Sequence, residues 1–223
     1  MSIKIFADTS SLEVIRSCEG NSIIGGYTTN PSIMRRQGVT DYPAFAQAAV
    51  NATSKPISFE VIADDFDEME RQARKLAAFG RNVYVKIPIT NTRGQTSIPL
   101  INRLSLAGVK VNVTALTARE QVKGILAFAP MIVSIFAGRI ADTGRNPCIH
   151  FMGPKIPGVE FLWASPREVL NIYQAELAGA DIITCTPDLI MKYERFKAMD
   201  LDELSLMTVK QFYDDAQAAG LKL

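Results

Sequence analysis

The chain has 223 residues, of which 48% are hydrophobic, and it carries 24 basic against 23 acidic side chains. A net charge of +1 argues against a nucleic-acid or membrane-surface partner, because neither would meet a strongly charged face. The three cysteines are widely spaced and form no CxxC motif, so a reducing, cytoplasmic compartment is expected. The single histidine excludes a His-rich metal site, and neither a signal peptide nor a bilayer-spanning segment is expected.

Short apolar runs alternate with longer amphipathic stretches along the whole chain. Strands are predicted at 3–8, 23–29, 56–62, 83–89, 109–114, 131–137, 159–165 and 181–186. Helices are predicted at 11–18, 41–53, 65–79, 97–107, 118–128, 166–178, 188–197 and, in the tail, 201–223. Eight strands that alternate with helices predict a single α/β domain over residues 1–223, a (β/α)8 TIM barrel with an additional C-terminal helix.

The unit after the sixth strand departs from this pattern. Residues 138–158 contain several glycines and prolines and show no helical periodicity. We therefore expect the helix after the sixth strand to be reduced or replaced by a loop. The amphipathic tail must pack on the barrel or on a neighbouring subunit.

Alternation within each strand assigns its side chains to the two faces of the barrel wall. Between residues 83 and 89, valines and isoleucines alternate with Tyr84 and Lys86, which therefore face the barrel axis. The same parity places a largely polar set inside: Phe6, Asp8, Thr28, Asn30, Ser58, Glu60, Lys110, Asn112, Thr114, Ser134, Phe136, Thr184 and Thr186.

So many polar residues inside a barrel call for an explanation. Barrel interiors are ordinarily filled with branched apolar side chains, and an unpaired buried polar group costs about 1–3 kcal/mol. The polar set lies toward the carboxyl ends of the strands, where barrel enzymes place their active sites. A satisfied hydrogen-bond network around a structural lysine is the alternative interpretation.

Lys86 is the most informative member of this set. A lysine kept away from water loses its proton easily, and a neutral amine can attack a carbonyl and form a Schiff base. Asp8 and Glu60 could supply the acid–base groups for such chemistry, and the amides and hydroxyls suit a polyhydroxylated substrate. Arg139 and Arg167, together with a helix start after the seventh strand, indicate a phosphate site at the rim. No metal and no cofactor is implied.

Seven short motifs follow one another along the chain. They are FADT at 6–9, TTNPS at 28–32, SFEV at 58–61, VKIP at 85–88, NVT at 112–114, FAGRIAD at 136–142 and ASPR at 164–167. In this order and strand spacing, the chain resembles the transaldolase family, in the short form that includes the fructose-6-phosphate aldolases.

The resemblance implies a role for each matched residue. Lys86 would form the Schiff base with the C2 carbonyl of a ketose, and Asp8 would take the proton of the C4 hydroxyl. Glu60 would act through a water held by Thr114. The implied substrate-binding residues are Thr28, Asn30, Asn112, Ser134 and Phe136, with Arg139, Ser165 and Arg167 for the phosphate. The resemblance also implies a homo-oligomer, a pentamer or decamer in which the C-terminal helix lies across a neighbour.

Two positions favour a transaldolase within this family. The aldolases of this family are similar to this chain but have glutamine at the position of Glu60 and tyrosine at that of Phe136, whereas this chain has the residues of the transaldolases at both. The expected reaction moves a dihydroxyacetone unit from sedoheptulose-7-phosphate or fructose-6-phosphate to an aldose phosphate, as in the pentose phosphate pathway. Two alternatives remain open: a fructose-6-phosphate aldolase or related dihydroxyacetone-using aldolase, and a non-catalytic barrel that binds sugar phosphates.

Overall fold

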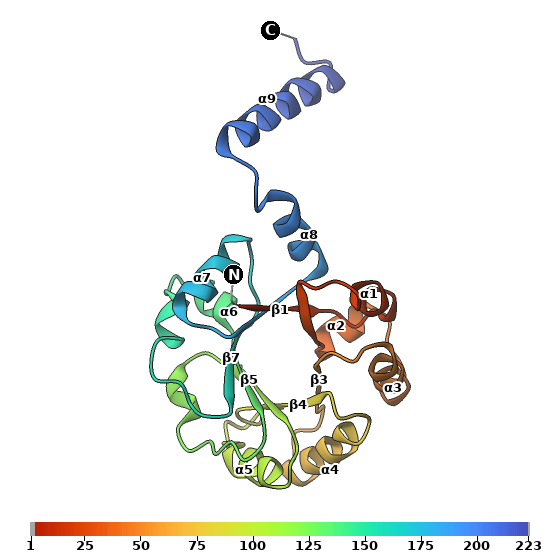
Figure 1. The fold of residues 1–223 in the computed structure, drawn as a ribbon, viewed down its shortest axis with the longest axis vertical. Helices are drawn as coiled ribbons and strands as arrows, with labels where there is room; N and C mark the ends of the chain where they lie inside the picture. The colour runs from red at the N-terminus through yellow and green to blue at the C-terminus, as the bar shows by residue number, and fades with distance from the viewer. Residues whose placement is uncertain (1–2, 223) are drawn as a thin grey trace.

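The strands form a closed barrel in which each pairs in parallel with its neighbour in the chain, and β1 pairs with β8 (Figure 1). The computed structural model describes residues 3–222. The strands are β1 (Lys4–Asp8), β2 (Ile24–Thr28), β3 (Ile57–Glu60), β4 (Val83–Pro88), β5 (Val111–Leu116), β6 (Met131–Ile135), β7 (Val159–Trp163) and β8 (Ile182–Cys185). The predicted (β/α)8 barrel is confirmed.

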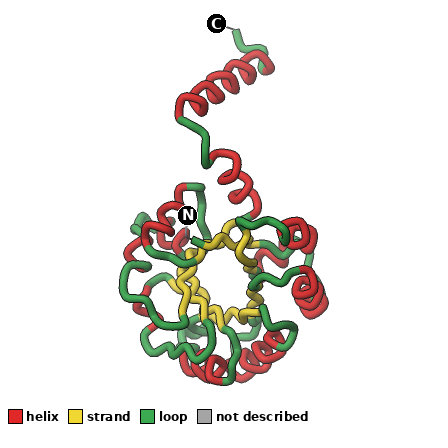
Figure 2. The backbone as a smooth tube through the Cα atoms, viewed as in Figure 1, coloured by secondary structure: helices red, strands yellow, loops and turns green. Residues whose placement is uncertain are grey.

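The helices lie around the ring of strands, except at the C-terminal end of the chain, where they extend away from it (Figure 2). They are α1 (Leu12–Cys18), α2 (Pro31–Arg36), α3 (Tyr42–Ala52), α4 (Phe66–Ala77), α5 (Ile98–Leu106), α6 (Ala137–Ala141), α7 (Leu170–Ala178), α8 (Pro187–Phe196) and α9 (Leu201–Ala218), with short 3-10 helices η1 (Arg119–Val122) and η2 (Pro147–His150). Asp65 caps α4 as predicted, because its Oδ1 accepts from the N–H groups of Asp67 and Glu68.

The core has two layers, one on each side of the barrel wall. The outer layer, between strands and helices, includes the outward-facing residues of β4: Val83, Val85 and Ile87. The inner layer lies on the barrel axis and comprises Phe6, Tyr84, Ile132, Leu162, Ala164 and Ile182, with Phe136 packed against it. The predicted alternation of inward and outward side chains is therefore confirmed for this strand.

The prediction of a helix at 118–128 is wrong. After β5 the chain forms only η1, and turns and loop follow over 123–130. Gly124 has a φ of +91°, in the left-handed region where a helix stops. Asn102 of α5 donates to the carbonyl of Gly124 and accepts from the N–H of Leu126, so the loop backbone is satisfied without a helix.

The unit after β6 is reduced, as predicted. Its helix α6 has five residues, and η2 adds one further turn before β7. Phe151, which follows η2, is buried and stacks on Trp163 of β7 with ring centroids 5.0 Å apart. Arg119 of η1 donates to the carbonyl oxygens of Phe151 and Pro154. An anchored loop therefore covers β7 on this side of the barrel.

The short helix α2 was not predicted, although the sequence carries its signals. Asn30 Oδ1 accepts from the N–H of Ile33 at 3.0 Å, which is an N-cap. Pro31 occupies the first helical position, where a missing N–H has no consequence. A cap followed by proline directly after a strand therefore indicated this helix.

The helix after β7 begins later than the predicted residue 166. It starts at Leu170, and Asn171 Oδ1 accepts from the backbone N–H of Arg167 at 2.7 Å, which holds the preceding residues in a turn. The helix start that was expected beside Ser165 and Arg167 is therefore displaced along the chain, and that part of the rim presents side chains instead.

The helix α9 extends away from the barrel (Figures 1 and 2). It has 18 residues, and none of them is buried. Asp200 caps it, accepting from the N–H of Glu203 at 2.7 Å. Across residues 3–222, no helix is both long and apolar enough to cross a bilayer.

Candidate active site

A pocket of about 510 Å³ opens where the strands end at their carboxyl termini. Every residue of the predicted site except Asn112 lines it. These residues are Asp8, Thr28, Asn30, Glu60, Lys86, Thr114, Ser134, Phe136, Arg139, Ser165 and Arg167. Over residues 3–222, no group of three or more His, Cys, Asp and Glu side chains is placed to hold a metal ion.

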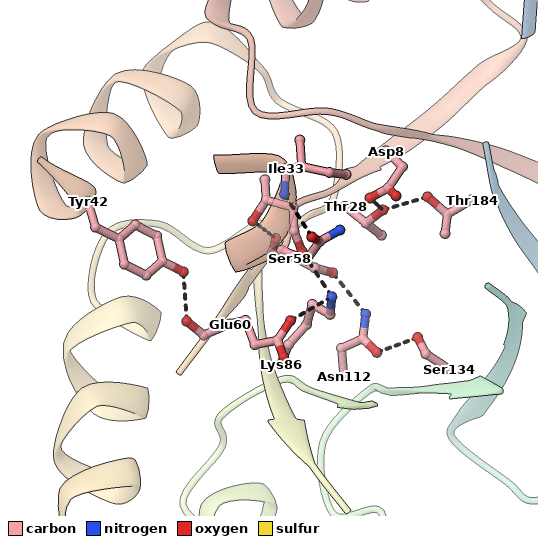
Figure 3. A network of polar contacts seen from close by, with 12 residues as sticks. Asp8, Thr28, Ile33, Tyr42, Ser58, Glu60, Lys86, Asn112, Ser134 and Thr184 are labelled. Carbon is pink, nitrogen blue, oxygen red and sulfur yellow. Dashed lines mark hydrogen bonds and ion pairs between the residues drawn. The ribbon is translucent and has the colours of Figure 1, made fainter. Parts of the chain in front are cut away.

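Lys86 lies at the centre of the polar network in this pocket (Figure 3). Its Nζ is 2.9 Å from Glu60 Oε2 and donates to the carbonyl oxygen of Thr29 at 2.9 Å. The pairing of β3 with β4 places Glu60 directly opposite Lys86, so the strand register brings the two groups together. The lysine side chain is 8% exposed. The amine is therefore shielded from bulk water, as the strand parity predicts, and is held by a carboxylate.

Asp8 stands on the same pocket wall, at the end of β1. Its Oδ1 accepts from Thr28 Oγ1 at 2.7 Å, and Thr28 Oγ1 in turn lies 2.5 Å from Thr184 Oγ1. Burial raises the pKa of Asp8 above its ordinary value, while Lys86, the hydrogen bond from Thr28, and Arg36 offset part of this rise. A carboxyl whose pKa is raised toward neutrality is a better proton acceptor and donor for catalysis.

Asn112 lies behind the pocket rather than on its surface. It is fully buried; its Nδ2 donates to Ser58 Oγ at 3.1 Å and its Oδ1 accepts from Ser134 Oγ at 2.7 Å. The predicted contact between this amide and a substrate stays a prediction. In the structure, Asn112 orients the Ser134 hydroxyl, which does line the pocket.

Two further contacts fix the backbone around Glu60 and Asn30. Tyr42 Oη donates to the carbonyl oxygen of Glu60 at 2.8 Å and so ties the end of β3 to α3. The Oδ1 of Asn30 already accepts the hydrogen bond that caps α2, so its Nδ2 is the group that could donate to a ligand.

Thr114 presents a buried hydroxyl to the pocket. Its Oγ1 has no hydrogen-bond partner among residues 3–222, although the residue is only 1% exposed. The next residue, Ala115, has a φ of +64°, and the pairing of β5 with β6 shifts register here. The strand thus bulges just after Thr114, as strands often do beside active sites. An unpaired buried hydroxyl in a polar pocket is suited to hold a water or a substrate hydroxyl.

The rim carries the arginines that the sequence analysis assigned to a phosphate. The guanidinium of Arg139 lies over the ring of Phe136, 5.4 Å from its centroid. Arg167 makes an ion pair with Asp142, with Nη2 2.6 Å from Oδ2, and both side chains are more than half exposed. These cations stand at the solvent-exposed mouth, above the buried lysine and its carboxylates.

Ser165 is positioned by an unusually close approach of two backbones. Its φ is +60°, and its carbonyl oxygen lies where a Cβ on Gly138 would stand, only 1.7 Å from the ideal Cβ position. Only glycine fits at residue 138, so the glycine of the FAGRIAD motif shapes the rim beside Arg139.

The pocket also contains a charged side chain that was not predicted from the sequence. Arg36, on α2, lines the same pocket as Arg139 and Arg167. Its charge favours the ionised form of Asp8. The signal was available, because Arg36 lies within two helical turns of the Asn30 cap, but the helix that carries it was not predicted.

Curated relatives match nearly the whole chain. A protein of Thermoanaerobacter sp. (strain X514) named "Probable transaldolase" is 30% identical over 227 residues, covering 99% of this chain and 100% of the relative. Another with the same name, from Roseiflexus sp. (strain RS-1), is 33% identical over 206 residues, covering 89% and 93%. A third, from Methanococcus maripaludis (strain C5 / ATCC BAA-1333), is 31% identical over 196 residues, covering 85% and 89%.

Among solved structures, a "putative phosphonomutase" from Burkholderia cenocepacia J2315 superposes with a TM-score of 0.54 at 12% identity. It covers 88% of this chain and 90% of its own, and the likeness shows the shared fold alone.

Fold and pocket first define a class: a closed α/β barrel with ionisable groups gathered at the carboxyl ends of its strands, where barrel enzymes carry out their chemistry. The transaldolase/fructose-6-phosphate aldolase family matches residues 5–223, and the chain belongs to that family. Membership makes it an enzyme of the aldolase or aldol-transferase type.

Proposed function

We propose that the protein is a transaldolase that works through a Schiff base on Lys86. The observation that carries the proposal is the buried amine of Lys86, 2.9 Å from Glu60 and in one pocket with Asp8. An amine flanked by two carboxylates has a proton acceptor for its own activation and a second acid–base group for the substrate.

The first stage forms the covalent intermediate. Glu60 receives a proton from Lys86, whose neutral Nζ adds to the C2 carbonyl of the ketose and gives a carbinolamine. Glu60 then returns a proton to the carbinolamine hydroxyl, which leaves as water, and the iminium forms. A water on the unpaired hydroxyl of Thr114 could relay these protons, because both residues line the pocket.

The second stage breaks the C3–C4 bond. Asp8 takes the proton of the C4 hydroxyl, the C4 oxygen becomes an aldehyde carbonyl, and the bonding electron pair moves into the iminium to give an enamine. A carboxylate with a raised pKa is suited to hold this proton and return it later. The departing aldose phosphate leaves the dihydroxyacetone unit on Lys86.

The third stage reverses the second and then the first, with a different aldehyde as the acceptor. C3 of the enamine attacks the aldehyde of an acceptor aldose phosphate, Asp8 returns its proton to the new C4 oxygen, and water hydrolyses the iminium to free Lys86. In this proposal Thr28, Asn30 and Ser134, which line the pocket, contribute to binding the dihydroxyacetone unit. The buried position of Lys86 supports the transferase, since a shielded enamine survives until the acceptor arrives.

The phosphate of either sugar fits the rim. Arg139 and Arg167 are exposed cations at the mouth, and Ser165, whose backbone approaches Gly138 beside Arg139, lines the same pocket. Arg167 is paired with Asp142 in the structure. A bound phosphate group could replace Asp142 as the partner of Arg167, because it carries more negative charge and three acceptor oxygens. The donors that we propose are sedoheptulose-7-phosphate and fructose-6-phosphate, which would place the enzyme in the pentose phosphate pathway.

A second candidate within the same family is a fructose-6-phosphate aldolase, because the family that matches the chain includes such enzymes. An aldolase would protonate the enamine and release dihydroxyacetone. Incubation with fructose-6-phosphate and erythrose-4-phosphate separates the two. We expect a seven-carbon ketose phosphate and little free dihydroxyacetone; the opposite product ratio would support the aldolase.

The covalent step is tested by borohydride reduction during incubation with fructose-6-phosphate. We expect the mass of a reduced dihydroxyacetone adduct on the peptide that contains Lys86. Binding without any adduct would support the third possibility, a non-catalytic barrel that binds sugar phosphates.

We also propose that the enzyme is a cytoplasmic homo-oligomer, a pentamer or decamer. The support is α9, which carries large exposed apolar side chains and buries none: Leu201, Leu204, Leu206, Val209, Phe212 and Tyr213. A second copy of the chain could cover this face. Light scattering on the full chain tests it, and a monomer at micromolar concentration would contradict it.

A further inference from the structure

Three hydroxyl- and carboxyl-bearing residues form a continuous chain across the seam of the barrel. Asp8, Thr28 and Thr184 lie on β1, β2 and β8, which are neighbours only because β1 pairs with both of the others (Figure 3). Asp8 is paired with Thr28, and Thr184 is paired with Phe6, two residues before Asp8. Closure of the barrel therefore brings residue 184 to residue 28.

The direction of the hydrogen bonds follows from the number of hydrogens. Thr28 has one hydroxyl hydrogen, which it donates to Asp8; the distance from Thr28 Oγ1 to Asp8 Oδ1 is 2.7 Å. An ionised carboxylate can only accept, so Thr28 must donate there. The short contact between the two threonine oxygens then requires Thr184 as the donor and Thr28 as the acceptor. Both threonines are buried, at 2% and 6% exposure, so water competes little for these hydrogens.

We propose that Thr184 is a positioning residue for Asp8, acting through Thr28 to hold that carboxylate oriented and ionised between proton transfers. The proposal rests on the proposed function, in which Asp8 exchanges a proton with the sugar. Chained hydrogen bonds polarise one another, so a donor into Thr28 strengthens the bond that Thr28 makes to Asp8. Within residues 3–222, Thr184 is hydrogen-bonded to Thr28 and not to the carboxylate, so in this role it acts on Asp8 indirectly.

The charges around Asp8 define what the threonine chain must compete with. The charged groups that act on this carboxyl come from three elements: Lys86 on β4, Glu60 on β3 and Arg36 on α2. On β8, the charge of Asp8 in turn contributes to raising the pKa of the Cys185 thiol. Burial raises the pKa of Asp8; the positive charges of Lys86 and Arg36 lower it, and the negative charge of Glu60 raises it. The hydrogen bond from Thr28 also lowers the pKa of Asp8. By strengthening that bond, Thr184 would lower this pKa further, in the same direction as the two cations.

The decisive experiment measures the titration of Asp8 directly. The carboxyl carbon of Asp8 is followed by NMR in protein labelled with ¹³C-aspartate, and its signal is assigned by its loss in Asp8→Asn. We expect Thr184→Val, which keeps the shape and removes the hydroxyl, to raise the titration midpoint by about half a pH unit. Thr184→Ser keeps the donor and should restore the wild-type midpoint.

A double-mutant cycle shows whether the effect passes through Thr28. Thr28→Val should raise the midpoint more than Thr184→Val, because it removes the direct bond to Asp8. Adding Thr184→Val to Thr28→Val should then change nothing further. An unchanged midpoint in Thr184→Val, an equal shift in Thr184→Ser, or full additivity in the double variant would each overturn the proposal.

The pH dependence of turnover connects the titration to catalysis. In Thr184→Val the acid limb of kcat/KM should move to higher pH by the same amount, about half a unit. A role in packing alone would lower activity at every pH without moving the limb. If the wild-type protein neither transfers nor cleaves sugars, the proposed function fails, while the NMR titration still decides whether Thr184 acts on Asp8.

Discussion

The inside of this barrel is divided along its axis into two layers that share the same strands. The apolar floor is the inner layer of the core described above, and the polar mouth contains the polar residues that line the pocket. On β1, Phe6 belongs to the apolar floor and Asp8, two residues later, to the polar mouth. On β4, Tyr84 and Lys86 repeat the arrangement. A shift of two residues keeps the side chain inside and moves it about 7 Å toward the carboxyl end. Position along the axis thus decides whether an inward residue supports packing or chemistry.

The two layers also differ in how their groups are stabilised. Floor residues contact one another and gain from leaving water, at roughly 25 cal/mol per Å² of apolar surface. Mouth residues contact polar partners: Lys86 has Glu60, and Asp8 has Thr28. Charges and hydroxyls so deep in a barrel are held by specific pairs, so changes in the two layers should have separable consequences.

The largest expected effect follows from removing the amine of the mouth. Lys86→Met keeps the approximate length of the side chain and removes the nucleophile, so transfer should fall by about 10⁴-fold or more. Binding of a sugar phosphate should persist, because the rim arginines remain. Single-turnover assays and calorimetry measure the two quantities separately.

The matched control is Lys110→Met. Lys110 also faces the barrel interior, but at the floor end, where its Nζ donates to the carbonyl of Arg81 and lies 5.6 Å from the ring centroid of Tyr84. Its variant should keep both activity and the borohydride adduct. Substantial turnover in Lys86→Met, or an adduct that depends on Lys110, would identify a different nucleophile.

The next effect comes from the floor and acts on stability. Ile132 is 1% exposed and belongs to the inner apolar cluster. Ile132→Ala leaves a cavity there and should lower the free energy of unfolding by about 2–5 kcal/mol. Urea denaturation measures this. In buffer where the variant is folded, the borohydride adduct on Lys86 should still form.

Ile132→Val provides the graded control, with an expected loss of about 1 kcal/mol. If Ile132→Ala changed stability by less than the valine variant, the inner cluster would not be packed as described. If it abolished the adduct while the protein stayed folded, floor and mouth would not be separable.

The division into layers was largely predictable from the sequence. Strict alternation in the strands assigned the inward side chains, and the direction of the strands then placed Asp8, Glu60 and Lys86 at one end. These assignments hold because a parallel barrel allows each inward residue only one face. The predicted pocket set and the lining of the observed pocket therefore agree closely.

What the sequence did not show, or predicted wrongly, depends on contacts between elements. The helix predicted at 118–128 is amphipathic in sequence, but Asn102 stabilises a loop there instead. Asn112 has the correct parity, yet its amide is committed to Ser58 and Ser134 and lies behind the pocket. Parity gives the face of a residue and not its depth, which the neighbours set.

The smallest predicted effect concerns the stability cost of the mouth. Burial raises the pKa of Asp8 in the folded protein above its ordinary value of 3.8, so within this pH window the folded state holds a proton that the unfolded state has released. The free energy of unfolding therefore decreases as the pH rises from 3.8 through the raised pKa. Asp8→Asn removes this pH-dependent contribution, so above that window the variant should be more stable than wild type.

Urea denaturation between pH 3 and pH 8 checks both the sign and the window. At pH 3 the carboxyl of Asp8 is largely protonated in both the folded and the unfolded protein, so the difference in stability between variant and wild type should be smallest there and should grow as the pH rises. The exposed residue Asp214 offers the control, since Asp214→Asn should track wild type throughout. Lower stability of Asp8→Asn at pH 8 would mean that Lys86 and Thr28 more than compensate the burial of Asp8. The mouth would then be as well stabilised as the floor, and the contrast between the layers would rest on activity alone.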